Sequence, residues 1–78
     1  MAHEKYAHIG TTETKVIEEC SELIQAICKA DRFGYLNYHP DRKGESNLKD
    51  IRSEIEDVRR RLNEYEQYLR VTFDTEAP

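Results

Sequence analysis

The sequence contains no tryptophan, one methionine, two prolines and three glycines among its 78 residues. Glycine and proline mark turns and loops, and within the interior of the chain they fall at Gly34, Pro40 and Gly44. The chain also has no apolar run approaching the roughly 20 residues that cross a membrane. The first residues lack a signal-peptide pattern. We therefore expect a protein of the cytoplasm without membrane association, and with one break near the middle of the chain.

Cysteine is equally scarce, and Cys20 and Cys28 are the two present. Eight residues of helix would separate them by about 12 Å, which is too far for a disulfide. We expect both thiols to be reduced. A chain this short forms at most one domain, spanning residues 1–78, and its core is marginal when it stands alone. Self-association is the expected way to complete that core.

Charge patterning points to helices and away from nucleic acid. Charged residues make up 36% of the chain and hydrophobic residues 37%, with a mean hydropathy of -0.91 and a net charge of -4. This composition is typical of long helices whose remaining apolar face is covered by a partner. Nucleic-acid binding usually needs a concentrated basic face, so we expect no nucleic-acid partner.

Two helices are predicted from caps and apolar spacing. Thr11 or Thr12 can cap a helix over about residues 12–33 that ends at Gly34. Ser46 or Asn47 can cap a second helix over about residues 47–70. Apolar residues recur at helical spacing in both: Val16, Ile17, Cys20, Leu23, Ile24, Ile27 and Cys28 in the first, and Leu48, Ile51, Ile55, Val58, Leu62, Tyr65 and Leu69 in the second.

The predicted fold is therefore all-α, a hairpin of two long helices. The apolar positions of the second helix alternate three and four residues apart, as in a seam that packs against another helix. Two such hairpins would form a four-helix bundle. We expect residues 1–10 to be a lead-in or a packing arm, and residues 72–78 to fray. The loop over residues 34–46 is long for so small a domain, and long loops are often functional.

Acidic residues occur in pairs on both predicted helices. Glu19 with Glu22, and Glu54 with Asp57, are three residues apart and so project from one side of their helices. A packed hairpin would bring the two pairs together, and four carboxylates repel one another unless cations lie among them. Oxygen ligands favour Mg²⁺ or Mn²⁺, and such ions assist phosphate-ester hydrolysis. By spacing alone, solvated acids balanced by neighbouring lysines and arginines are the favoured interpretation.

A resemblance adds to this pattern. The string Glu18-Glu19-x-x-Glu22, followed by Glu54-x-x-Asp57, resembles the motif of MazG-like all-α nucleoside triphosphate pyrophosphohydrolases. The stretch 24–34, which reads I-Q-A-x-x-K-x-x-R-F-G, resembles a phage and bacterial subgroup. That subgroup continues with a proline-containing loop and an asparagine that opens the second helix, which corresponds to Asn47. Two features depart from the family: the spacer between Glu22 and Glu54 is longer than in many members, and residues 59–61 are all arginine.

The resemblance implies a hydrolase that converts a nucleoside or deoxynucleoside triphosphate to the monophosphate and pyrophosphate with Mg²⁺. It implies a homodimer or homotetramer. The implied metal ligands are Glu19, Glu22, Glu54 and Asp57, with Glu18 as an accessory catalytic carboxylate. Implied or candidate substrate contacts are Lys29, Arg32, Asn47 and Arg61.

We expect the 34–46 loop to close over a bound nucleotide, with Lys29 and Arg32 meeting the phosphates. Arg42 would then lie at the exposed tip. Tyr35 and Tyr38 have two interpretations: they stack on a base, or they pack the loop onto the helices, and packing is slightly favoured.

Other functions compete with this interpretation. His39-Pro40-Asp41 resembles the loop of J-domains, the Hsp70 co-chaperone modules, which are also helical hairpins. A J-domain needs a basic helix leading directly into that loop, whereas here the preceding helix carries Glu18, Glu19 and Glu22 and is broken at Gly34. A non-catalytic helical interaction module is a third interpretation. It accounts for the heptad spacing of apolar residues in the second helix but not for the long loop.

Overall fold

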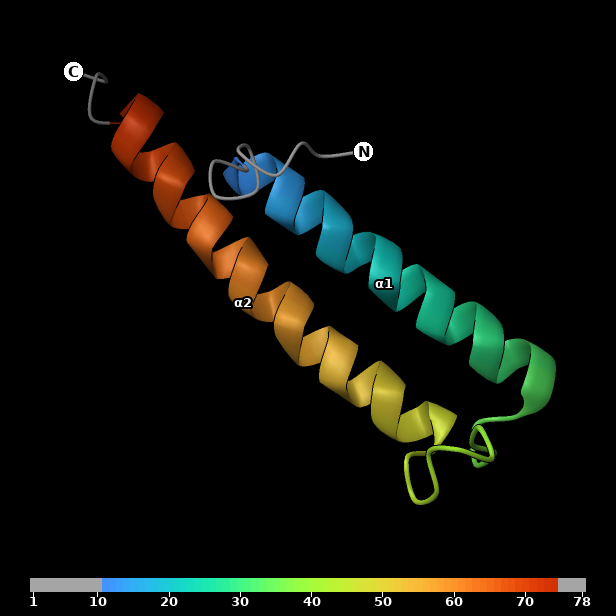
Figure 1. The fold of residues 1–78 in the computed structure, drawn as a ribbon. Coiled ribbons are helices and arrows are strands. Elements are labelled where there is room, and N and C mark those ends of the chain that lie inside the picture. Colours follow the sequence, from blue (N-terminus) through green and yellow to red (C-terminus); the bar gives the residue numbers. More distant parts are fainter. Residues whose placement is uncertain (1–10, 75–78) are drawn as a thin grey trace, which may run out of the picture.

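The computed structural model describes residues 11–74, which form a single antiparallel hairpin of two α-helices (Figure 1). Helix α1 spans Thr12–Phe33 and helix α2 spans Asn47–Phe73. Over the described range, β structure is limited to one isolated antiparallel bridge, between Tyr38 and Ser46. The all-α prediction is thus confirmed. Neither described helix is long and apolar enough to cross a membrane. The expectations for residues 1–10 and 75–78 lie outside the described residues.

Side-chain caps set the start of each helix. The backbone N–H of Thr14 donates to Thr11 Oγ1 at 3.0 Å, and that of Lys49 donates to Ser46 Oγ at 3.2 Å. Such caps satisfy N–H groups that have no partner within the helix. At the other end of α1, Gly34 has a φ of 99°, and its N–H donates to the carbonyl of Ala30 at 2.8 Å. The bounds of α1 agree with those predicted.

Helix α2 extends three residues beyond its predicted end at residue 70. No glycine or proline follows Arg70 until Pro78, so nothing in the local sequence stops the helix there. The ring of Phe73 lies edge-on to that of Tyr68, with centroids 6.5 Å apart, a geometry that aromatic pairs prefer. Phe73 lies in the last turn of α2, within the segment 72–78 that was expected to fray, and it is helical in the structure.

Backbone hydrogen bonds fix the loop between the helices. The N–H of Leu48 donates to the carbonyl of Tyr35 at 2.7 Å, and the N–H of Asn47 donates to that of Asn37 at 2.8 Å. The side-chain amide of Asn47 also donates to the Gly34 carbonyl at 2.8 Å, and Asn47 is 5% exposed. The loop is therefore attached to the first turn of α2 rather than free in solvent.

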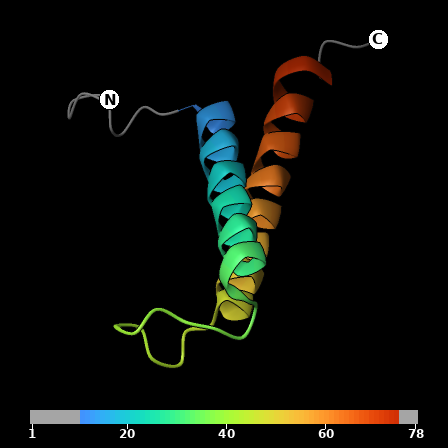
Figure 2. The same ribbon diagram turned by 90° about the vertical axis from the view of Figure 1, so that its right-hand side faces the viewer.

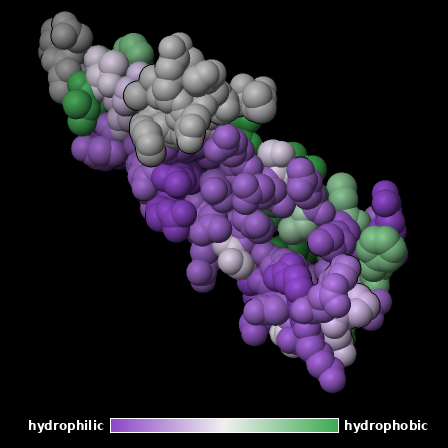
Figure 3. All heavy atoms as spheres, in the orientation of Figure 1, coloured by the Kyte–Doolittle hydropathy of each residue, from purple (hydrophilic) through white to green (hydrophobic). Residues whose placement is uncertain are grey.

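The buried core lies at the loop end of the hairpin. Its apolar members are Ala30 and Ile51, next to buried Asn47. Figures 1 and 2 together show the two helices running side by side and crossing at an angle. Many large apolar residues remain exposed, including Ile17 at 67% and Ile24 at 61%. In Figure 3, green side chains gather along α1 and at the far end of α2, beside a mostly hydrophilic face.

The predicted seam of α2 is covered over only part of its length. Its residues Leu48, Ile51, Ile55, Val58 and Tyr65 are buried or half-buried, whereas Leu62 and Leu69 are exposed. Both exposed residues lie in the second half of α2, away from the loop, where α1 alone does not cover them.

Candidate metal centre and adjoining groove

Three carboxylates from the two helices converge between them. One ligand oxygen each from Glu19, Glu22 and Glu54 can be chosen so that all lie within 4.8 Å of one another. Glu54 is half-buried because it lies between Ile51 and Val58 on the row of α2 that faces α1. Glu19 and Glu22 sit one turn apart on α1. The structure thus brings together three of the four carboxylates predicted as metal ligands.

Two oxygens of this acidic trio, Glu19, Glu22 and Glu54, are left without partners. Glu19 Oε1 and Glu54 Oε1 are inaccessible to solvent and have no hydrogen-bond partner among the described residues. Burying an unpaired polar oxygen is costly, and a divalent cation would satisfy both groups at once. The donor set consists of carboxylate oxygens alone, which are the ligands that Mg²⁺ and Mn²⁺ prefer. The residues present therefore fit the metal that the motif implies.

Burial raises the pKa of Glu54 above its ordinary value of 4.5. The negative charges of Glu22, Asp57, Glu19 and Asp50 raise this pKa further, in that order. Both effects disfavour the ionised form of a carboxyl group. Without a cation, the folded protein therefore holds a proton on Glu54 more tightly than the unfolded chain does.

Asp57 and Glu18 lie outside the acidic trio. Asp57 pairs with Arg60 on its own helix at 3.2 Å, although its charge is close enough to affect Glu54. The Glu18 side chain is exposed. A spacing of three residues places Asp57 beside Glu54 but does not aim it at α1, so the predicted four-carboxylate set is incomplete within one hairpin.

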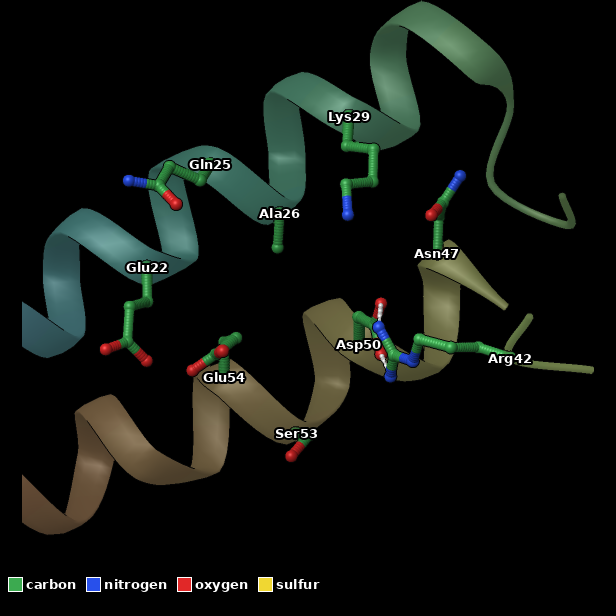
Figure 4. A pocket seen from close by; sticks show the side chains of 9 residues that line it. All are labelled: Glu22, Gln25, Ala26, Lys29, Arg42, Asn47, Asp50, Ser53 and Glu54. Carbon is green, nitrogen blue, oxygen red and sulfur yellow. Dashed lines mark hydrogen bonds and ion pairs between the residues drawn. The ribbon is translucent and has the colours of Figure 1, made fainter. Parts of the chain in front are cut away.

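A polar groove of about 340 Å³ adjoins the acidic trio (Figure 4). Figure 4 shows Glu22 and Glu54 pointing into the space between the helices, with Lys29 further toward the loop. Arg42 reaches the same groove from the loop. Acidic and basic groups thus line one hollow, which suits a ligand with a bound cation at one end and uncompensated negative charge at the other. Its lining residues are Glu22, Gln25, Ala26, Lys29, Arg42, Asn47, Asp50, Ser53 and Glu54.

Arg42 is exposed, as expected, and it also folds back to the groove. Its guanidinium forms two hydrogen bonds to the Asp50 carboxylate, at 3.0 and 3.3 Å. The side chain lines the groove and is 50% exposed. Arg32, which was expected to meet the phosphates, lies over the Phe33 ring at 5.9 Å and does not line the groove. The loop folds back along α2, and this long-range pairing has no signal in local spacing.

Asn47 and Arg61 have structural roles beyond the predicted substrate contacts. The Asn47 amide attaches the loop, as described above, while its side chain also lines the groove. Arg61 lies three residues beyond Val58, pairs with Glu64 at 3.0 Å and does not line the groove. Its Nε is inaccessible and lacks a hydrogen-bond partner among the described residues. The sequence interpretation did not include Gln25, Asp50 and Ser53, although Asp50, Ser53 and Glu54 share helical spacing.

No protein-family model, curated protein or solved structure matches the chain.

The raised pKa of Glu54 predicts a pH-dependent effect of Glu54→Gln. In metal-free protein, wild-type stability should fall as pH rises from 4.5 through the folded-state pKa of Glu54, because the folded state binds the proton more tightly. The glutamine variant has no carboxyl group at this position, so its stability should not fall in this way. Thermal unfolding with EDTA should therefore show the variant more stable than wild type at pH 7, with the difference shrinking below about pH 4.

Added Mg²⁺ should reverse the order, because it stabilises wild type and has little effect on the variant. Glu56→Gln, an exposed carboxylate on α2, is the control and should follow wild type. A Glu54→Gln protein that is less stable than wild type at neutral pH without metal would contradict the electrostatic account.

Proposed function

We propose that this protein is a Mg²⁺-dependent pyrophosphohydrolase that converts a nucleoside or deoxynucleoside triphosphate to the monophosphate and pyrophosphate. The observation that carries the proposal is the shared groove: Glu22 and Glu54 of the acidic trio and the cations Lys29 and Arg42 line one hollow. A solvated acidic patch would be expected to scatter its carboxylates over the surface. Here they lie between the helices, and two of their oxygens are buried with no hydrogen-bond partner within residues 11–74.

Each group has a distinct part in this reaction. When bound, Mg²⁺ neutralises phosphate oxygens and lowers the pKa of a coordinated water. Glu19, Glu22 and Glu54 would hold it, and Asp57 would add negative charge close by. Lys29 and Arg42 would contact the terminal phosphates. Asp50 accepts hydrogen bonds from Arg42 Nη1 and Nη2 and so holds the guanidinium in the groove. The cation is therefore positioned before substrate arrives.

The chemistry balances without any further reactant. A water oxygen attacks the α-phosphorus, and the bond between that phosphorus and the α–β bridging oxygen breaks. The water contributes a hydroxyl group to the monophosphate and a proton to solvent or to pyrophosphate. Negative charge grows on the leaving pyrophosphate, where Lys29 and Arg42 would stabilise it.

Assembly of two or more hairpins into a four-helix bundle belongs to the same proposal. The exposed residues Ile17, Ile24 and Ile27 form an apolar row on α1, and Leu62 and Leu69 form one on α2. A second copy would cover these rows and could bring its own acidic residues near the site. A cytoplasmic location agrees with two free thiols, Cys20 and Cys28.

The direct test is a panel of nucleoside and deoxynucleoside triphosphates incubated with Mg²⁺. The expected products are monophosphate and pyrophosphate in equal amounts, resolved by ion-exchange chromatography. Glu22→Gln should lower turnover by a factor on the order of a hundred or more, since it removes a ligand charge. Glu56→Gln should match wild type. Release of diphosphate and orthophosphate would refute this reaction, and wild-type rates in Glu22→Gln would refute the ligand assignment.

The position of Arg42 in the groove predicts a contrast between two arginines. Arg42→Ala should slow turnover by about ten- to hundredfold through loss of a phosphate contact, with the lower figure reflecting its exposure to water. Arg32→Ala should have little effect, because Arg32 lies outside the groove. Steady-state kinetics on the best substrate of the panel will compare them. Equal effects would show that the phosphates do not lie against Arg42.

The exposed apolar rows predict association that one charge can disrupt. Sedimentation velocity should show at least a dimer at micromolar concentration. Leu62→Asp should give monomers with reduced helicity, because it places an unpaired charge at a covered position. Asn63→Asp adds the same charge at the next, exposed residue and should leave assembly intact. A stable, folded wild-type monomer would contradict the bundle.

A further inference from the structure

A second hollow shares Lys29 and Asn47 with the polar groove. It has a volume of about 350 Å³, and its walls include Phe33, Tyr38 and Pro40. We name this hollow the ring pocket. Lys29 and Asn47 line both spaces, so the two hollows adjoin each other at these residues. One end is charged and polar, and the other carries aromatic and prolyl rings.

We propose that the ring pocket binds the base of the nucleotide whose phosphates lie in the polar groove. This inference rests on the proposed function. It adds a binding site for the base, which carboxylates that hold a metal ion cannot recognise. Phe33 is 57% exposed and Tyr38 is 45% exposed, so their ring surfaces are available to a planar heterocycle. Stacking of a base on an aromatic side chain is favourable for every base.

The walls of the ring pocket are held in place by the loop. Tyr38 forms the antiparallel bridge with Ser46, and the Asn37 side-chain amide donates to the Phe33 carbonyl. His39 Nδ1 accepts the Asp41 N–H at 3.1 Å, so a neutral imidazole carries its proton on Nε2. The pocket thus combines ring surfaces with one imidazole donor, the usual composition of a small-molecule site.

The chemistry of the two adjoining hollows selects the occupant. A purely apolar ligand would leave the Lys29 amine beside it without a counter-charge. An inorganic polyphosphate would leave the ring pocket empty. A nucleotide places an anion against Lys29 and Arg42, a sugar beside Asn47 and a base against Tyr38, so a single ligand matches the chemistry of each part.

NMR titration separates this inference from the proposed function, because it does not require hydrolysis. Adenosine, cytidine and thymidine, at millimolar concentrations, are added to the ¹⁵N-labelled protein, and Mg²⁺ with tripolyphosphate is added to a second sample. We expect at least one nucleoside to shift the resonances of Asn37, Tyr38 and His39. Tripolyphosphate should instead shift those of Lys29 and Arg42.

Two tyrosines provide a matched pair of variants. Tyr38→Ala should remove the nucleoside shifts, whereas Tyr35→Ala should keep them, because Tyr35 does not line the ring pocket. Tyr38→Phe should restore binding, which shows that the ring and not the loop fold is responsible. With an active enzyme, Tyr38→Ala should raise the KM for the triphosphate by about 5- to 150-fold, the range expected for one lost stacking contact.

The outcomes are distinguishable. Nucleoside shifts at Tyr38 without hydrolysis of any triphosphate would support the ring pocket and refute the enzyme. Hydrolysis of triphosphates without nucleoside shifts, or with equal KM changes in Tyr35→Ala and Tyr38→Ala, would overturn the ring pocket and leave the enzyme standing. Concentration-dependent shifts at Phe33 and Tyr38 without ligand would show that a second copy occupies the pocket, which also overturns the inference.

Discussion

The attachment of the loop by Asn47 is the interaction on which the rest of the structure depends. This residue starts α2, is buried, and donates through its side chain to Gly34, the residue that ends α1. Its backbone N–H donates to the carbonyl of Asn37 in the same loop. Because both helices are fixed at this point, the register between them is set. That register places Glu54 opposite Glu19 and Glu22 two turns further along.

The same register places polar residues in the contact between the two helices, which lowers the stability of the hairpin. The row of α2 that faces α1 contains Ile51 and Val58, but also Glu54 and Arg61. A purely apolar row would bury more surface and leave fewer unpaired polar atoms. Instead, oxygens of Glu19 and Glu54 are buried without partners in the described part of the chain, and the pKa of Glu54 is raised. Such local conflicts are most often found where a protein binds something, which is why this position supports a functional site rather than a structural one.

Much of the fold could be predicted from local sequence, because caps and periodicity are local. Thr11 and Ser46 fix the helix starts, and Gly34, in a left-handed conformation that suits glycine, ends α1.

The candidate site could be predicted in part. The pairs Glu19–Glu22 and Glu54–Asp57 include the three carboxylates that converge in the structure. Asp57 lies outside the acidic trio because sharing a side of a helix does not ensure that two residues face the same neighbour. The presence of Arg42 and the absence of Arg32 in the groove lining could not be predicted, because the path of a loop depends on contacts such as Arg42 with Asp50, which follow no sequence period. How much of the α2 seam is covered depends on how many neighbours pack around it, and one sequence does not encode that number directly.

The exposed apolar residues away from the loop have a consequence for the amount of folded protein in a cell. Close to Asn47 the two helices cover each other, whereas Ile17 and Leu69 are exposed in the single hairpin. If a second copy covers them, folding is coupled to association, and the folded fraction rises with the abundance of the chain itself. Scarce chains would expose their helix ends to proteases more often than abundant ones. The same substitution at these ends would then be tolerated at high expression and deleterious at low expression.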